Sequence, residues 1–225
     1  MCSKNVLSVG FLLFLRITVC AQLPGAVQKT ILFDEERKQL SIQYLKTRHG
    51  LEQSDPTIIP RVIVLHWTAI PSVEATFNTF NRSALPASRK AISSASQLNV
   101  SSQYLVDRDG TVYQLMPETM FARHVIGLNY CAIGVENIGS DKMPLTDAQL
   151  LANERIVRYL AGKYPIEYLI GHYEYQKFRG HSLWREADDS YLTIKTDPGE
   201  LFMKKIRERL SDLNLKAAPS PDSIP

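Results

Sequence analysis

Cysteine is scarce in this sequence, which excludes a fold held together by disulfide bonds. The chain has 225 residues and three cysteines. Two of them, Cys2 and Cys20, lie in a segment that we predict is removed from the mature protein. Cys131 then has no partner within the chain, so the mature protein has to rely on its hydrophobic core. Because Cys131 stands in an apolar run, we interpret it as a small buried side chain rather than a nucleophile.

The sequence also lacks a large excess of either charge. Its formal net charge is +3, and two of the positive charges, Lys4 and Arg16, lie in the first 21 residues, which contain no acidic residue. The remaining chain is therefore close to neutral, and nothing in it favours binding to nucleic acid. Charged residues make up 22% and hydrophobic residues 44% of the chain, which is ordinary for a globular protein. The length fits one domain with extensions.

No apolar run is long enough to span a membrane. Val6–Leu15 is mostly apolar, but Arg16 ends the run well short of the roughly 20 residues that a spanning helix requires. With its charged start and small residues near its end, Met1–Ala21 is predicted to be a secretory signal peptide, cleaved before Gln22. An alternative is lipid attachment at Cys20. Both alternatives predict a secreted or periplasmic protein without a transmembrane segment after cleavage.

A short apolar strand is the clearest feature of the remaining chain. Val62–Leu65 consists of β-branched residues and leucine, a composition typical of a strand buried on both faces. It is followed by His66, where the chain leaves the sheet for a loop. A histidine there can present a ring nitrogen to a ligand at the sheet edge, or it can be a core residue bonded to a backbone carbonyl. The local sequence leaves both interpretations open.

Strands and helices alternate along the chain, which predicts an α/β domain. The predicted helices are Asp34–His49, Ser72–Leu85, Thr146–Tyr164 and Pro198–Leu213. The predicted strands are Val62–Leu65, Gln103–Val106, Thr111–Leu115, Ala132–Asn137 and Tyr168–Ile170, with Asp109-Gly110 in a hairpin turn. We expect a signal peptide (1–21), an N-terminal extension with one helix (22–59), a catalytic domain (60–213) and a disordered tail rich in proline and serine (214–225).

Three side chains that can bind a metal occur where strands end or a helix begins. His66 and His172 each directly follow a short apolar strand, and the ends of such strands converge at one edge of a sheet. Asp197 stands just before the last predicted helix. Two imidazoles and one carboxylate form a three-ligand set suited to catalytic zinc, which keeps a fourth position for water. Asp197 could instead serve only as the cap of the helix.

Five blocks of sequence occur in a characteristic order. They are VLHWT at 64–68, SSQYLVDRDGTVYQL at 101–115, ARHVIGLNYCAIGVENIG at 122–139, LIGH at 169–172 and KTDPG at 195–199. Together they resemble the zinc-dependent N-acetylmuramoyl-L-alanine amidases of the amidase type 2 family, whose fold is shared by the animal peptidoglycan-recognition proteins. The resemblance covers roughly residues 60–210. It implies an α/β fold with a central mixed β-sheet flanked by helices, a Zn²⁺ cofactor, and peptidoglycan or muropeptide as the substrate. We expect a monomer.

The resemblance also assigns roles to individual residues. It implies that the metal ligands are His66, His172 and Asp197. The glutamate of the family's corresponding strand falls on Glu136, which could take a proton from the attacking water and later give it to the departing amine. Lys195 falls on the family's lysine, and it could stabilise the oxyanion of the tetrahedral intermediate. The alternatives are a strand carboxylate paired with a basic residue for Glu136 and a solvated loop cation for Lys195.

Further residues are candidates for substrate contact. In the family, a histidine near the position of His124 lines the substrate cleft, and we therefore expect His124 and Asn129 to contact the substrate. Trp67 follows the first metal histidine and could form an apolar wall for sugar or peptide, although core packing explains this residue equally well.

An insertion between the second and third ligands departs from the commonest family pattern. The segment Tyr173–Ile194 carries His181, which also follows a glycine and is therefore the alternative second ligand. We favour His172, because the end of a strand is positioned by the sheet whereas His181 lies in polar loop sequence.

The sequence supports two functions of different classes. The first is a secreted zinc amidase that cuts the bond between N-acetylmuramic acid and the L-alanine of the stem peptide. The second is a non-catalytic peptidoglycan-binding protein of the same fold, because some relatives lose a zinc ligand and only bind. The complete ligand set, with Glu136 and Lys195, favours the enzyme. A hydrolase of the same fold that acts on another acylated peptide is a third option.

Overall fold

A mixed β-sheet forms the centre of the protein. The computed structural model describes residues 22–86 and 95–220, so the predicted signal peptide lies outside the described residues. Within them the sheet has six strands in the order β1-β4-β3-β5-β2-β6. The strands are β1 (Val27–Gln28), β2 (Val62–Trp67), β3 (Tyr104–Val106), β4 (Val112–Gln114), β5 (Ala132–Asn137) and β6 (Tyr168–Gly171). The hairpin β3–β4 is antiparallel and the other pairs are parallel, as expected for a mixed sheet.

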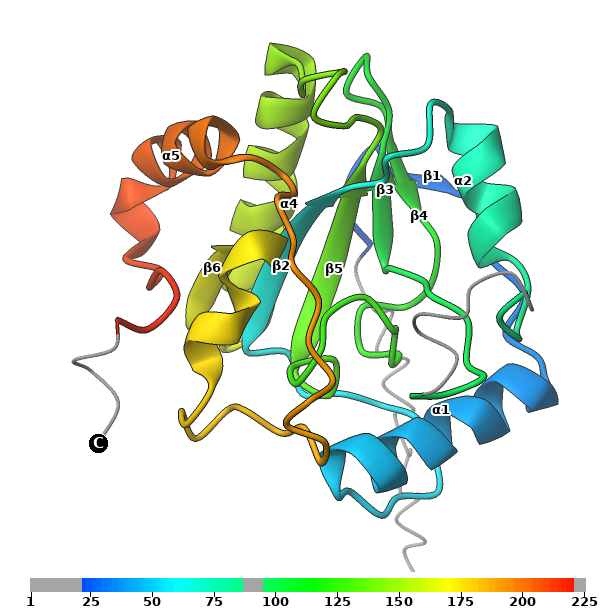
Figure 1. The fold of residues 1–225 in the computed structure, drawn as a ribbon. Coiled ribbons are helices and arrows are strands. Elements are labelled where there is room, and N and C mark those ends of the chain that lie inside the picture. The colour runs from blue at the N-terminus through cyan, green and yellow to red at the C-terminus, as the bar shows by residue number, and fades with distance from the viewer. Residues whose placement is uncertain (1–21, 87–94, 221–225) are drawn as a thin grey trace, which may run out of the picture.

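Helices lie on both sides of this sheet. They are α1 (Glu35–His49), α2 (Val73–Phe80), α4 (Asp147–Lys163) and α5 (Glu200–Arg209), with short 3₁₀ helices η1 (His172–Phe178) and η2 (Ser211–Leu213). Figure 1 shows α4 behind the sheet with α5 beside it, η1 on the opposite side and α1 across the lower end. The fold predicted from the sequence is therefore confirmed: an α/β domain with a central sheet flanked by helices.

Strand β2 is covered on both faces, as its composition predicted. Ile63 and Leu65 belong to the core cluster formed with α4 and α5, whereas Val62 and Val64 face a second cluster that includes residues of η1. Side chains of a strand alternate between the two faces, so His66 continues the side of Val62 and Val64. The next residue, Trp67, continues the opposite side.

The helix boundaries have local causes. The Asp34 side chain accepts a hydrogen bond from the Arg37 backbone N–H at the start of α1, and Gly50 ends that helix in a left-handed conformation. Thr146 and Gln149 form a capping box at the start of α4. Helix α2 ends at Phe80, earlier than the Leu85 that we predicted. The Asn99 side chain donates to the carbonyls of Thr79 and Arg82 there, and this draws the chain out of the helix.

The extension and the tail are both tied to the domain. Tyr44 and Leu45 of α1 are buried in the same core cluster as the sheet residues, so the N-terminal extension packs as part of the domain. The disordered tail expected over 214–225 stays a prediction, and its residues 221–225 lie outside the described residues. The Lys216 backbone donates to the Glu167 carbonyl and accepts from the Leu169 N–H, alongside β6. Strand β6 lies at the edge of the sheet, where backbone N–H and C=O groups have no neighbouring strand, and the chain around Lys216 pairs with them.

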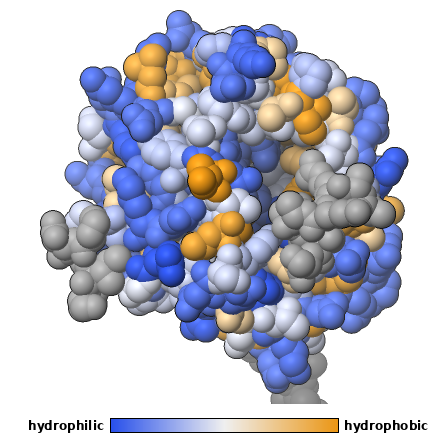
Figure 2. All heavy atoms as spheres, in the orientation of Figure 1, coloured by the Kyte–Doolittle hydropathy of each residue, from blue (hydrophilic) through white to orange (hydrophobic). Residues whose placement is uncertain are grey.

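The surface agrees with a protein exposed to water. The face in Figure 2 is mainly hydrophilic, with small separate hydrophobic patches near its centre. Large exposed apolar side chains are scattered, the most exposed being Ile194 at 94%. In the part of the chain that the structure describes, we find no helix that combines the length and the apolar character needed to cross a membrane.

Candidate metal centre

Three predicted ligands meet at one edge of the sheet. His66 lies near the end of β2, His172 directly follows β6, and Asp197 lies between the insertion and α5. The Nδ1 atoms of His66 and His172 are 3.0 Å apart. Asp197 Oδ2 lies 3.1 Å from Nδ1 of His66 and 3.0 Å from Nδ1 of His172. All three residues are buried. The parallel pairing of β2 with β6 brings these histidines together although 106 residues separate them.

The spacing of the three atoms fits a tetrahedral metal site. Zinc forms bonds of about 2.0–2.1 Å to nitrogen and oxygen, so two ligands of a tetrahedral site lie about 3.3 Å apart. The observed separations of 3.0–3.1 Å are close to that value. Among the described residues, this is the one group of three or more metal-binding side chains whose ligand atoms come together. A set of two imidazole nitrogens and one carboxylate oxygen suits Zn²⁺.

His124 determines which nitrogen of His66 faces the other ligands. The Ala132 carbonyl lies 3.2 Å from His124 Nε2 and can only accept, so this nitrogen carries the proton. Burial first, and then neighbouring His66, hold the pKa of His124 well below its usual value, so the ring is neutral. Nδ1 of His124 therefore accepts a hydrogen bond from the His66 Nε2–H group, at 3.1 Å. The lone pair of a neutral His66 is then on Nδ1, which faces His172 and Asp197.

The close fit of His124 also explains a glycine in β5. A Cβ added at Gly134 would lie 2.9 Å from Cγ of the His124 ring. Real Cβ atoms do not approach so closely, so only glycine lets the ring lie against the sheet at this point. His124 is thus packed behind His66, and its ring centroid is 5.1 Å from that of His66 in an edge-to-face arrangement.

The ionisation states at neutral pH match those that bind metal. Burial lowers the pKa of His172 to about 4; neighbouring His66 lowers this pKa further, and Asp197 opposes the decrease. Burial works to raise the pKa of Asp197, but the two histidines outweigh it and hold this pKa well below its usual range. The structure therefore presents neutral imidazole and ionised carboxylate, the forms that coordinate zinc without prior loss of a proton.

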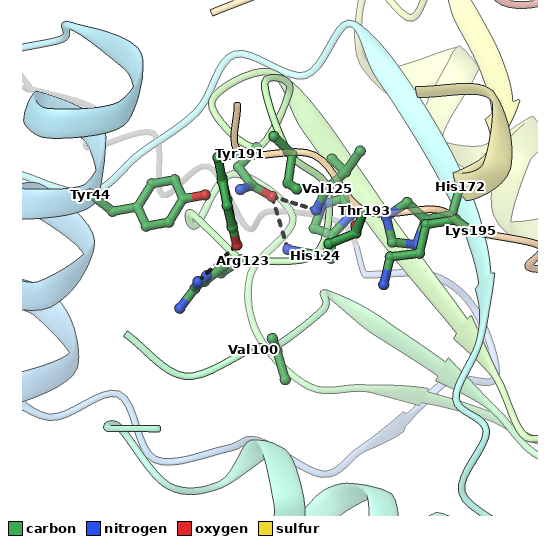
Figure 3. A pocket seen from close by; sticks show the side chains of 11 residues that line it. Tyr44, Val100, Arg123, His124, Val125, His172, Tyr191, Thr193 and Lys195 are labelled. Carbon is green, nitrogen blue, oxygen red and sulfur yellow. Dashed lines mark hydrogen bonds between the residues drawn. The ribbon is translucent and has the colours of Figure 1, made fainter. Parts of the chain in front are cut away.

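The two predicted catalytic residues flank the ligands. Glu136 pairs in register with His66 across β2 and β5, so both side chains leave the same face of the sheet. Glu136, Lys195 and Trp67 line one cleft with the three ligands. We call this cleft, with a volume of about 340 Å³, the metal cleft. Figure 3 shows the Lys195 side chain beside His172. The structure thus brings the predicted catalytic residues to the ligands.

The predicted substrate residues take different positions. Trp67 forms a wall between the metal cleft and a neighbouring pocket that reaches α4 and α5. The Asn129 side-chain oxygen accepts hydrogen bonds from the backbone N–H groups of His124 and Val125, so it shapes their loop. His124 touches the cleft but lies mainly behind His66. For His124 and Asn129, substrate contact stays a prediction.

His181 lies away from the ligands. Its Nε2 is 3.2 Å from the Tyr168 hydroxyl, and its Nδ1 accepts from the Leu183 N–H at 3.1 Å. Both ring nitrogens are therefore engaged in holding the insertion against β6. The structure places His172, rather than the alternative His181, beside His66.

Three residues near the metal cleft were missed by the sequence analysis. Tyr44 of α1, and Tyr191 and Thr193 of the insertion, line a pocket that adjoins the metal cleft. Tyr44 reads as one apolar position of an amphipathic helix, and nothing near Tyr191 or Thr193 resembles a motif. Only the packing of α1 against the insertion brings these side chains together.

Comparisons with known proteins address both fold and family. One solved structure, the endolysin N-acetylmuramoyl-L-alanine amidase LysCS from Clostridium intestinale, is 16% identical over 87% of this chain and 99% of its own, with a TM-score of 0.51. A selenomethionine derivative of AmpD is 19% identical over 83% of this chain and 95% of its own, with a TM-score of 0.50. At these identities the likeness shows a shared fold. A comparison with curated proteins finds no match.

The family is shown by the sequence itself. The profile described as N-acetylmuramoyl-L-alanine amidase matches residues 54–200, a stretch that contains all three ligands, Glu136 and Lys195. The match starts after α1, so that helix lies outside it. The chain belongs to the N-acetylmuramoyl-L-alanine amidase family.

Proposed function

We propose that this protein is an extracytoplasmic zinc-dependent amidase that hydrolyses the bond between N-acetylmuramic acid and the L-alanine of the peptidoglycan stem peptide. The observation that carries the proposal is the group His66, His172 and Asp197, whose three candidate ligand atoms lie 3.0–3.1 Å apart in a buried site. Burying an ionised carboxylate beside neutral imidazoles is unfavourable unless a cation compensates its charge. The membership of the amidase family supports the same reaction.

A bound zinc ion would supply Lewis acidity, which lowers the pKa of water to ~7 and polarises a carbonyl group. The chain supplies the proton transfers and the remaining charge stabilisation. Glu136, beside His66, takes the proton of the attacking water and passes it to the nitrogen of the departing amine. Lys195 presents its ammonium group to the oxygen that becomes negative in the tetrahedral intermediate.

His124 acts in this proposal as a positioning residue. Its proton on Nε2 is held by the Ala132 carbonyl, and this leaves Nδ1 to accept from His66. His66 is then held in the tautomer that offers Nδ1 to the metal. Outer partners of this kind orient a ligand and raise its basicity. The function that we assign to His124 therefore differs from the substrate contact implied by the family resemblance.

We also propose the location and boundaries predicted from the sequence: a signal peptide over 1–21 and a catalytic domain that begins near residue 60. The family acts on cell-wall material, which lies outside the cytoplasm, and this supports an extracytoplasmic location. The packing of α1 into the domain core indicates that the extension is retained in the folded enzyme.

The test is hydrolysis of a defined muramoyl peptide, followed by mass spectrometry of the products. We expect a free muramoyl sugar and a peptide with N-terminal L-alanine. Activity should disappear with a chelator and return with Zn²⁺. Cleavage that persists without metal would refute the zinc mechanism. If the zinc-loaded protein binds peptidoglycan but releases no peptide, the protein is a binder of the same fold.

A further inference from the structure

The cleft has opposite charge on its two sides. One neighbouring pocket lies beyond Trp67 and has three carboxylates, Asp141, Asp147 and Glu200, with Lys205 as its cation. The pocket on the other side, which we call the side pocket, lies between α1 and the end of the insertion. Among the described residues, its lining has two cations, Arg123 and Lys195, and no carboxylate. A substrate with an acidic part and an uncharged part would therefore enter with the acidic part toward the side pocket.

The side pocket is continuous with the metal cleft. His124, His172, Lys195 and Arg123 line both of them. The side pocket has a volume of about 130 Å³, several times the roughly 10–15 Å³ that one water requires. A substrate group bound in the side pocket would therefore lie close to the amide bond that is placed over the metal ligands.

Buried polar atoms around the side pocket lack hydrogen-bond partners. The Tyr44 hydroxyl, Asn129 Nδ2 and Thr193 Oγ1 are each buried and have no partner among the residues that the structure describes. Tyr44 and Asn129 are both only 1% exposed. Figure 3 shows the Tyr44 ring reaching from α1 with its hydroxyl directed toward Arg123 and Tyr191. A buried donor without an acceptor costs about 1–3 kcal/mol, so such donors around one cavity indicate a missing acceptor.

The wall of the side pocket is held in place in part by α1, which lies outside the family match. Arg48 of α1 forms an ion pair with Glu186, at 2.6 Å, and its guanidinium lies 4.7 Å from the centre of the Tyr191 ring. Tyr191 accepts a hydrogen bond from Arg123 Nη2 at 3.2 Å. Arg123 in turn lies 5.3 Å from the centre of the Tyr44 ring. Helix α1 therefore supplies Tyr44 directly and fixes Tyr191 through the insertion.

We propose that the side pocket is a carboxylate subsite, which binds an acidic group of the peptide on the L-alanine side of the scissile bond. Hydroxyl, amide N–H, ammonium and guanidinium groups surround it, and all of these can donate to a carboxylate. The uncharged sugar then lies on the Trp67 side of the cleft. There the sugar ring can pack against the indole, and its hydroxyl groups can donate hydrogen bonds to the carboxylates. This inference rests on the proposed amidase function, and it specifies that the enzyme selects peptides with an acidic group at this position.

The test compares two muramoyl dipeptides that differ in one group. In the first, the residue after L-alanine has a free α-carboxylate; in the second, that group is a carboxamide. We measure dissociation constants by calorimetry on zinc-loaded E136Q protein, and kcat/KM on the unaltered chain. Hydrogen bonds to charged groups contribute about 1.5–3 kcal/mol, so we expect the acid to bind at least tenfold more tightly than the amide.

The variant Y44F tests how much the side pocket contributes to the preference for the acid. Because the Tyr44 hydroxyl has no partner in the free protein, its removal should leave the melting temperature unchanged or raise it. The preference for the acid should fall about tenfold. Y113F, which changes a tyrosine of β4 outside both pockets, is the matched control and should keep the full preference.

The possible outcomes separate the two proposals. Equal affinity of the unaltered pocket for acid and amide would overturn the carboxylate subsite, even if both dipeptides are hydrolysed. An equal effect of Y44F on both ligands would also overturn it. A preference for the acid that Y44F removes, without hydrolysis of either dipeptide, would support the subsite and refute the amidase.

Discussion

Two buried clusters of ionisable side chains differ in how their charges are satisfied. In the first, Glu118 accepts from the Tyr104 hydroxyl at 2.6 Å, and from Lys163 Nζ and the Tyr164 hydroxyl at 2.9 Å. In the second, the facing atoms of the three metal ligands are two imidazole nitrogens and one carboxylate oxygen.

The difference shows which cluster needs something from outside the chain. The Glu118 cluster contains donors for its acceptor and a positive charge for its negative one, so it is complete within the fold. In the metal-ligand cluster, the proton of His66 points away toward His124, and the side-chain partners of the Asp197 carboxylate are two imidazoles rather than an ammonium or guanidinium group. Burial of such a group is unfavourable without a cation. We therefore expect the first cluster to stabilise the fold, whereas the second fits the metal site that we propose.

The largest effect on zinc binding and hydrolysis is expected from removal of one of the three candidate ligands. H172A should abolish zinc binding and reduce hydrolysis on the order of a thousandfold or more, because the remaining two ligands cannot hold the metal. Addition of zinc should raise the melting temperature of the unaltered protein but not that of the variant. H181A is the matched control, since His181 lies outside the cluster. If H172A retains stoichiometric zinc, our ligand set is incorrect.

A second substitution separates metal binding from chemistry. E136Q keeps the size of the side chain but removes its basicity, so hydrolysis should fall about 100- to 10,000-fold. The zinc content should not change, because Glu136 is not one of the three clustered ligand atoms. Metal analysis and steady-state kinetics on the same preparation check both statements. E74Q, an exposed residue of α2, should retain full activity. Near-normal hydrolysis by E136Q would require another general base.

A smaller effect on zinc affinity is expected from replacing His124, which is packed behind His66. H124F keeps an aromatic ring against Gly134 but cannot accept the proton of His66 Nε2. We expect zinc affinity to fall about 10- to 100-fold, the usual effect of losing an outer partner of a ligand. Competition with a chelator of known affinity measures this change. A substrate-contact role would instead raise KM at an unchanged zinc dissociation constant, and that result would contradict our assignment.

The smallest effect should appear in the cluster that is complete within the fold. Burial works to raise the pKa of Glu118, but hydrogen bonds from Tyr104, Lys163 and Tyr164 outweigh it and lower this pKa. A lowered pKa in the folded state contributes stability that is present above the unfolded pKa and is lost as pH falls through the folded one. E118Q should therefore lose about 2 kcal/mol of unfolding free energy at pH 7.

The pH dependence of E118Q checks this account. Its difference in stability from the unaltered protein should shrink below about pH 4.5, where Glu118 becomes protonated in the unfolded chain. Urea titrations at pH 7 and in acid measure it. Zinc affinity should be unchanged, because Glu118 is not among the clustered ligand atoms. A stability difference that stays constant through this range would mean that the charge of Glu118 does not contribute.

Local sequence predicted much of the fold because its signals are short-range. The N-cap of α1 and the capping box of α4 involve residues three positions apart, and the apolar composition of β2 indicates its burial directly. Asp109-Gly110 predicted the β3–β4 hairpin for the same reason. Strand β1 was missed because it has only two residues, both exposed, and its pairing partner β4 is far away in the chain.

The sequence by itself determined the candidate ligands, because a histidine at the end of a buried strand is visible in its immediate neighbours. It left His172 and His181 as alternatives, and the register of β2 with β6 decided between them. Only the tertiary structure placed His124 behind His66 and Tyr44 at the side pocket. These positions depend on how a loop and a helix pack against the sheet, and packing between distant segments leaves no periodic pattern in either of them.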